Sequence, residues 1–304
     1  MLLDRLVFQR TDFSYEVVVI DSGSTDGTVA TARDAGVRVH AISSSDFSHG
    51  ATRNLGASLC RGEYVAFLVQ DALPLNERWL SALVEALEND ERVAGVYSRQ
   101  LPRPESGPLT RILVGGWATA APKRRFQFAG NSDSYRALPP EEKLRVSAFD
   151  NVSSCVQRSI LEQHPFEQSG FGEDLRWGAS VVEAGYAVVY EPDSTVLHSH
   201  ERGVFYDLRR HYANGKLLLD LFGVSLTPNI LRLVLNTLLS TGYLGRRLFR
   251  EEKTLRRRIR FTLLAAAHAS VGQLGAYLAA KNILLASRNP RLSRAVDAFL
   301  EKGV

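Results

Sequence analysis

Apolar runs of strand length recur through the first hundred residues, with helix-like patterns between them. The run from Val65 to Gln70 is almost entirely apolar, which is typical of a strand buried on both faces of a sheet. The run from Tyr15 to Ile20 is rich in β-branched residues and predicts a second strand. Shorter strand patterns occur at 37–42 and 93–97. This alternation of strand and helix from residue 15 to 90 predicts an α/β sheet that is mostly parallel, with crossover helices on its faces.

A carboxylate directly follows each of the two strongest strand patterns. Asp21 comes after the first strand and Asp71 after the 65–70 strand. In open α/β sheets the ligand binds at the carboxyl ends of the strands, so these acids lie at the expected edge. Two acids at one edge concentrate negative charge, which a cation or a polar ligand would balance. The alternative is that Asp71 only caps a turn.

Composition and absent motifs narrow the class of protein. The net charge of +4, with 45% hydrophobic residues, is that of an ordinary globular protein and argues against general binding of nucleic acid. The chain has neither a G-x-G-x-x-G turn nor a G-x-x-x-x-G-K-[ST] loop, which removes the two commonest nucleotide-binding α/β classes. Cys60 and Cys155 are isolated, and Asp4 and Arg5 interrupt any secretory signal. These features predict a cytoplasmic protein.

Further candidate functional residues lie between residues 101 and 200. Residues 101–145 are rich in proline and basic side chains and predict an irregular, functional segment. Glu173 and Asp174 open a helix that runs to Gly185, and His198 and His200 follow a short strand pattern at 194–197. The helix macrodipole alone would favour an acid at such a position, so a purely structural role for the acidic pair stays open.

Five motifs occur together in one order and spacing: VIDSGSTDGT at 19–28, DFSHGATRN at 46–54, FLVQDALP at 67–74, GED at 172–174 and HSH at 198–200. In this respect residues 5–215 resemble the family 2 inverting glycosyltransferases of GT-A fold, and most closely the rhamnosyltransferase-like branch. The resemblance implies a nucleotide-sugar donor and a glycan or lipid-linked glycan acceptor. A sugar-phosphate nucleotidyltransferase would need a glycine-rich basic loop near the N-terminus, which this chain lacks.

The resemblance also implies roles for particular residues. Asp174, with Glu173 beside it, matches the catalytic base, and Trp177 is expected to contact the acceptor. Asp71 and His198 match residues that hold a divalent cation, Mn²⁺ or Mg²⁺. Gln70 and Val69 replace the other acids of the metal motif, which weakens the metal prediction. The residues expected to bind the donor are Asp21, Ser22, Arg53, Asn54, Gln70 and Asp71.

The implied chemistry is a single displacement at the anomeric carbon. One carboxylate takes the proton of the acceptor hydroxyl, and positive charge stabilises the leaving nucleoside diphosphate. The predicted function is therefore inverting transfer of a sugar, rhamnose from dTDP-rhamnose being the candidate, to a cell-surface glycan. About fourteen residues precede Tyr15, which is too few for the first strand of the family's fold. A GT-A module that lacks this strand, is catalytically impaired, and acts in binding or assembly is the alternative.

The last third of the chain is predicted to be helical. The sequence suggests a glycosyltransferase domain at 1–215, divided near residue 100 into donor-binding and acceptor-binding halves, followed by a helical region at 216–304. A basic cluster between Arg246 and Arg260 lies beside the largely apolar stretch 261–280. This arrangement fits peripheral contact of residues 245–280 with the inner face of the plasma membrane. Helices packed on the catalytic domain with a solvated basic face are the alternative.

Overall fold

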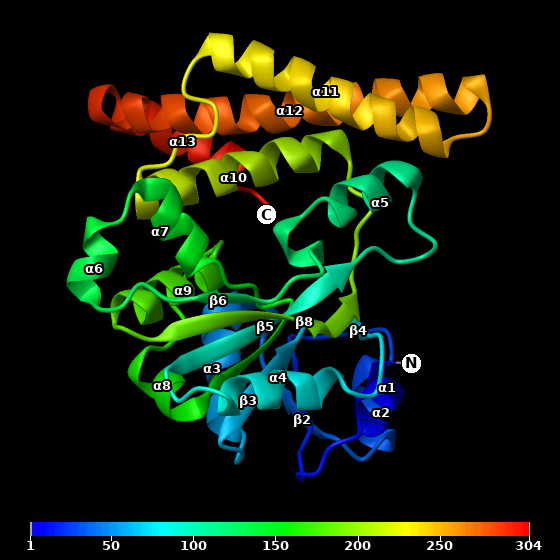
Figure 1. Cartoon of the computed structure of the whole chain (residues 1–304), viewed down its shortest axis with the longest axis vertical. Helices are drawn as coiled ribbons and strands as arrows, with labels where there is room; N and C mark the ends of the chain where they lie inside the picture. Colours follow the sequence, from blue (N-terminus) through cyan, green and yellow to red (C-terminus); the bar gives the residue numbers. More distant parts are fainter. Residues whose placement is uncertain (1, 304) are drawn as a thin grey trace. The chain divides into compact units, whose positions relative to one another are not determined.

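The chain forms two compact units in the computed structural model, which describes residues 2–303 (Figure 1). The first unit comprises the residues up to Leu101 together with Ala118–His198, and the second comprises Pro102–Trp117 together with the residues from Ser199 onward. The division thus lies at His198 and not at the expected residue 215. Gly215 lies inside helix α10 (Val204–Phe222), where the absence of a side chain lets Ala276 and Ala279 pack closely against the helix.

The first unit contains two sheets. Strands β1 (Val18–Asp21) and β2 (Arg38–Ala41) form a parallel pair. The larger sheet has the order β3-β7-β5-β8-β4, and β6 also pairs with β8. Its strands are β3 (Tyr64–Leu68), β4 (Leu73–Pro74), β5 (Val93–Leu101), β6 (Arg125–Gln127), β7 (Ser153–Gln157) and β8 (Ala187–Leu197).

The α/β class with flanking helices and a helical C-terminal region is confirmed, although the strand directions are more mixed than the pattern suggested. In the larger sheet β5 and β8 are parallel, while β7 runs antiparallel to both β3 and β5. The strand–helix alternation that predicts parallel pairing ends near residue 90. Strands β6 and β7 are then reached without a simple crossover helix and run in the opposite direction, whereas β8 follows α9 and is again parallel to β5.

Helices lie against both faces of the larger sheet. Residues of α4 (Trp79–Glu88) share one buried cluster with Val96 and Val189, while residues of α9 (Glu173–Glu183) share another with Tyr97 and Tyr190. Because neighbouring residues of a strand point to opposite faces, β5 and β8 are buried on both sides. The other helices of this unit are α1 (Leu2–Val7), α2 (Thr28–Asp34), α3 (His49–Leu59), α6 (Ser132–Ala137), α7 (Pro140–Ser147) and α8 (Arg158–Gln163).

Segment 101–145, which was expected to be irregular, contains several short elements. Two of its prolines stand in the first turn of a helix, where proline is tolerated because the N–H that it lacks has no partner within the helix. Pro108 begins α5 (Pro108–Gly115), and Pro140 begins α7. Short 3-10 turns occur at Ser44–Asp46 and Ala118–Ala120.

The second unit consists of α5, α10, α11 (Ile230–Glu251), α12 (Leu255–Arg288) and α13 (Pro290–Leu300). Helix α12 packs closely on α10 at Gly275. A Cβ atom at this position would lie only 2.4 Å from the carbonyl oxygen of Leu208. Helix α5 buries Leu109 and Ile112 against Leu244 and Leu248 of α11. Within residues 2–303, α12 is the one helix long and apolar enough to cross a membrane by length and composition alone, and a third of its most apolar window is buried.

Candidate active site

The strands of the larger sheet bring three parts of the chain to one edge. Strand β7 is antiparallel to β3, so it begins where β3 ends, and Leu68 pairs with Ser153. Strands β5 and β8 end together, because Leu101 pairs with Leu197. Asp71, residues 150–151 and His198 therefore lie at the same edge of the sheet, as the sequence suggested for Asp71.

Asp174 lies at the start of α9, beside the loop that precedes β7. The helix begins after Gly172, which adopts a left-handed conformation with φ of 76°. The Asp174 Oδ2 atom accepts a hydrogen bond of 3.4 Å from the backbone N–H of Asn151. Helix α9 lies close to the end of α7 at Gly178. A Cβ atom at this position would lie only 2.1 Å from the carbonyl oxygen of Ser147. These contacts fix the position of the Asp174 carboxyl group.

The protonation of Asp174 is strongly perturbed. Burial raises the pKa of Asp174 to about 7, and the neighbouring carboxylates of Glu173 and Asp150 add to the rise. The backbone N–H of Leu175 and the guanidinium of Arg53 act in the opposite direction, but more weakly. A carboxyl group that exchanges its proton near neutral pH is suited to act as a general acid or base.

A buried ion pair adjoins Asp174. The Arg53 guanidinium donates to Glu173 Oε1 at 2.6 Å and to the carbonyl oxygen of Asn151 at 3.3 Å. Only 14% of the Arg53 side chain and 8% of the Glu173 side chain are exposed. Helix α3 is held close by Gly50, where a Cβ atom would lie 2.0 Å from the carbonyl oxygen of Glu167. Arg53 thus joins α3, α9 and the loop before β7.

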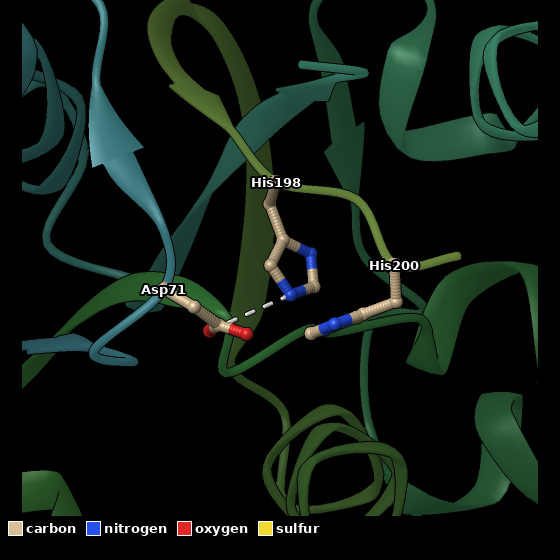
Figure 2. Close-up of side chains that lie close together, drawn as sticks. All are labelled: Asp71, His198 and His200. Atoms are coloured by element: carbon tan, nitrogen blue, oxygen red, sulfur yellow. Dashed lines mark ion pairs between the residues drawn. The ribbon is translucent and has the colours of Figure 1, made fainter. Parts of the chain in front are cut away.

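Asp71 and His198 form a second cluster (Figure 2). The Nε2 atom of His198 lies 3.7 Å from Asp71 Oδ1. The Nδ1 atom of His198 lies 3.0 Å from Gln100 Oε1. Because this oxygen only accepts, Nδ1 carries a proton, and in the neutral ring the lone pair of Nε2 faces Asp71.

The ligand atoms of this second cluster suit a divalent cation. A carboxylate oxygen and an imidazole nitrogen are both ligands of Mn²⁺. The hydrogen bond from Nδ1 to Gln100 is the kind of contact that orients a metal-binding histidine. His198 is only 6% exposed, which holds the ring in place.

Other residues expected to bind the donor are distributed over separate elements. Asp21 ends β1, and its Oδ2 atom accepts from the backbone N–H groups of Gly23 and Ser24. Hydrogen bonding to the Ser24 side chain, and then to the Gly23 backbone, lowers the pKa of Asp21. Ser22 follows in the same turn, and Gln70 is exposed in the turn after β3.

The amide of Asn54 has partners within the protein. Its Nδ2 atom donates to the carbonyl oxygen of Phe166, and its Oδ1 atom accepts from the N–H of the same residue. Both polar groups of Asn54 are thus used to hold the Phe166 backbone against α3. This contact gives Asn54 a structural role that the motif did not predict.

Trp177, which the resemblance assigned to the acceptor, is buried in the core. Its side chain is 2% exposed and packs against Phe149 and Phe166 in the core. Its Nε1 atom donates to the carbonyl oxygen of His164. Trp177 lies one turn after Glu173 on α9, on the face that covers the sheet, and so its apolar ring is buried rather than presented to a ligand.

Three residues near Asp174 and His198 received no role from the sequence. Asp150 precedes β7 and Gln100 lies near the end of β5, and the pairings of these two strands bring both residues to the site. His49 lies in the same motif as Arg53, and burial lowers its pKa. The position of His49 one helical turn before Arg53 was the one signal available for it.

Residues 2–150 match glycosyl transferase family 2, and the chain therefore contains a domain of this family. Its α/β fold is of the GT-A type. Among proteins of similar sequence, the chain is 32% identical over 217 residues to an O-antigen chain rhamnosyltransferase, RfbN, of Salmonella typhimurium. It is 30% identical over 213 residues to another, WbaN, of Salmonella anatum. Each alignment covers 68% of this chain and 64% of the relative, so the chain spans less than two thirds of either relative.

The fold is also similar to a solved structure of low sequence identity. This is a mannosyltransferase, PcManGT from Pyrobaculum calidifontis, in complex with GDP-Man and Mn²⁺. The alignment has a TM-score of 0.50 and 18% identity, and it covers 98% of this chain and 74% of the other. At this identity the likeness concerns the fold.

Proposed function

We propose that the protein is an inverting glycosyltransferase that moves a sugar from a nucleotide donor to a glycan acceptor, with Asp174 as the general base. The observation that carries the proposal is the Asp174 carboxyl group, which is fixed at the sheet edge and whose pKa is raised to about 7. When the pKa of a base is near the working pH, much of the base is deprotonated and each deprotonated group still binds a proton well.

In the proposed reaction the ionised Asp174 accepts the proton of an acceptor hydroxyl as that oxygen attacks the anomeric carbon. The bond between this carbon and the donor's diphosphate breaks on the opposite side, which inverts the configuration. Glu173 is not free to share this task, because Arg53 holds it at 2.6 Å. Its negative charge instead helps to raise the pKa of Asp174.

The leaving diphosphate would lie near Asp71. The Asp71 carboxylate and the Nε2 atom of His198 would hold a divalent cation, Mn²⁺ or Mg²⁺, which would supply positive charge at the diphosphate. The family match and the geometry of Asp71, His198 and Gln100 support this assignment. Asp21 and Ser22, in the turn after β1, are the residues that we assign to the nucleoside.

Rhamnose, supplied as dTDP-rhamnose, is the sugar that we propose. Its support is the identity of 32% and 30% to two O-antigen chain rhamnosyltransferases. The acceptor would then be a growing cell-surface glycan, either free or linked to a lipid. This transfer would take place in the cytoplasm.

The test is release of nucleoside diphosphate by the purified full-length protein, across a panel of nucleotide sugars with Mn²⁺ or Mg²⁺ present. We expect the greatest release from dTDP-rhamnose. Asp174→Asn should lower the rate of this release by about 10²- to 10⁴-fold, which is the usual contribution of a general base. Asp133→Asn is a matched control, because Asp133 is also an acid in the first turn of a helix but is exposed on α6.

The outcomes separate the alternatives. Unchanged release of nucleoside diphosphate by Asp174→Asn would remove Asp174 as the base. If no nucleotide sugar is cleaved while one of them still raises the melting temperature, the chain would be a GT-A module that binds without catalysis. Preference for another nucleotide sugar would leave the reaction class intact and replace only the sugar.

A further inference from the structure

Helix α11 carries an apolar stripe that is exposed in the second unit. Leu231, Leu235 and Leu238 recur at the spacing of one helix face, and Phe249 lies five full turns after Leu231. Leu231 is 74% exposed and Leu238 is 66% exposed. The opposite face of α11 is the buried one, since it packs Leu244 and Leu248 against α5. The exposed stripe is therefore additional to the face that stabilises the fold.

A groove between α11 and α12 continues this stripe. Figure 1 shows the two helices side by side, and the groove between them has a volume of 770 Å³. Its apolar walls are formed by Phe249 of α11 and by Ile259 and Leu263 of α12. Phe249, Ile259 and Leu263 are all exposed. We call the stripe and the groove together the α11–α12 surface.

Arginines surround the apolar part of the α11–α12 surface. Arg246 and Arg250 line the groove itself, and the guanidinium of Arg258 lies 4.6 Å from the Phe249 ring. Residues 246–260 hold eight basic and two acidic side chains, whereas the net charge of the whole chain is +4. The positive charge of the protein is thus concentrated where its largest set of exposed apolar side chains lies. Apolar side chains beside clustered arginines match an interface that is apolar within and anionic at its surface.

We propose that the α11–α12 surface docks the protein on a bilayer of anionic phospholipid. The two helices would lie in the plane of the membrane, with the apolar stripe among the acyl chains and the arginines at the phosphates. This contact goes beyond the proposed transfer reaction and does not depend on it. It also extends to residues 231–243 of α11, which the sequence did not assign to the membrane.

Contacts of α12 within the second unit oppose a spanning arrangement. Asn282 is buried and donates to the hydroxyl of Tyr212 and to Asp297, while His268 lies 2.6 Å from the Asp207 carboxylate. Gly275 packs against the backbone of α10. These contacts require α12 to stay beside α10 and α13, and its composition alone does not make it a membrane span. Docking leaves all of them intact.

A second copy of the chain is the other occupant to be tested. Two apposed surfaces would bring their arginine clusters together, and repulsion between like charges disfavours such a dimer. An anionic bilayer supplies the complementary charge. Self-association through this surface, without binding to vesicles, would overturn the proposal.

The experiment is sedimentation of the full-length protein with phosphatidylcholine vesicles, with and without phosphatidylglycerol, at low and high salt. We expect binding to the anionic vesicles only, and weaker binding in high salt because screening reduces the attraction. The double variant Arg246→Glu/Arg250→Glu should bind at least about tenfold more weakly. Arg291→Glu/Arg294→Glu makes the same charge change at exposed positions of α13 and should bind like the wild type.

The apolar component has its own variant pair. Leu238→Ser/Phe249→Ser should lower vesicle binding by about tenfold or more, because two large side chains no longer enter the bilayer. Phe8→Ser/Phe126→Ser removes exposed apolar side chains from the first unit and should not change it. All four residues are exposed, so thermal melting should confirm that each variant folds. Equal binding by the variants and their controls, or no binding by the wild type, would overturn the proposal.

Discussion

The carboxyl group of Asp174 is subject to two opposing effects. Its place in the first turn of α9 favours the ionised form, because the N-terminal end of a helix carries partial positive charge. Burial and the carboxylates of Glu173 and Asp150 favour the protonated form, and these effects dominate because the pKa is raised to about 7. The protein therefore loses stability when Asp174 ionises, and this loss is linked to the proposed role of the residue as a base.

The sign of this linkage can be tested with Asp174→Asn. Between about pH 4 and pH 7 the folded state holds the Asp174 proton and the unfolded state has released it, so wild-type stability falls as the pH rises. Asparagine does not titrate. The gain in free energy of unfolding from Asp174→Asn should be larger at pH 8 than at pH 5 by about 2 kcal/mol. Urea unfolding at both pH values measures it, and a gain that is equal at both would contradict the raised pKa.

Sequence alone located some site residues well and others poorly. Asp71 and His198 follow strand patterns directly, and their meeting at one edge needs only the rule on strand ends. The burial of Trp177 could not be predicted, because a motif gives neighbours along the chain but not the face of the helix. Gln100 could not be found, since its contact with His198 depends on the parallel register of β5 and β8.

At the scale of the elements, the Asp71–His198 pair depends on how two strands end. Leu73, just after Asp71, pairs with Leu197, just before His198, so the backbone itself brings the two side chains together. A cation at this position would thus be held by neighbouring strands of one sheet and would bind the folded state only. Binding to the folded state raises stability in proportion to occupancy.

Addition of Mn²⁺ should therefore raise the melting temperature of the wild-type protein by about 2–5 °C at saturating concentration. Asp71→Asn and His198→Ala should each abolish most of this shift, and so should a pH low enough to protonate histidine. Asp193→Asn, an exposed acid in β8, is the control that should keep the shift. A shift that survives both site variants would assign the ion to another place.

At the scale of the whole molecule, the two units are not successive stretches of chain. Residues 102–117 belong to the second unit although they interrupt the first, and α5 within them buries Leu109 and Ile112 on α11 and α12. The sequence did not predict this insertion, because hydrophobic periodicity reports that a face is buried but not which element covers it. The sequence placed the boundary at residue 215 for the same reason, because periodicity does not show that α10 packs on α12.

A chain that ends at residue 215 should consequently behave poorly. Loss of α11 and α12 would expose Leu109 and Ile112, and the soluble yield should fall several-fold relative to the full chain because an apolar patch promotes association. The same truncation with Leu109→Asn and Ile112→Asn should recover much of the yield. Size-exclusion chromatography would measure both. If the simple truncation is as soluble as the full chain, α5 does not need its partners.

Gly50 and Gly178 have a consequence for mutational tolerance. Every other amino acid adds a Cβ atom, which at these positions would lie 2.0 Å and 2.1 Å from a backbone carbonyl oxygen. No codon change away from glycine is therefore conservative there, whatever the new side chain. The two glycines allow close packing of α3 and α9, the helices that carry Arg53 and Asp174. A sequence library selected for folding should thus keep both glycines even where the chemistry of the site is lost.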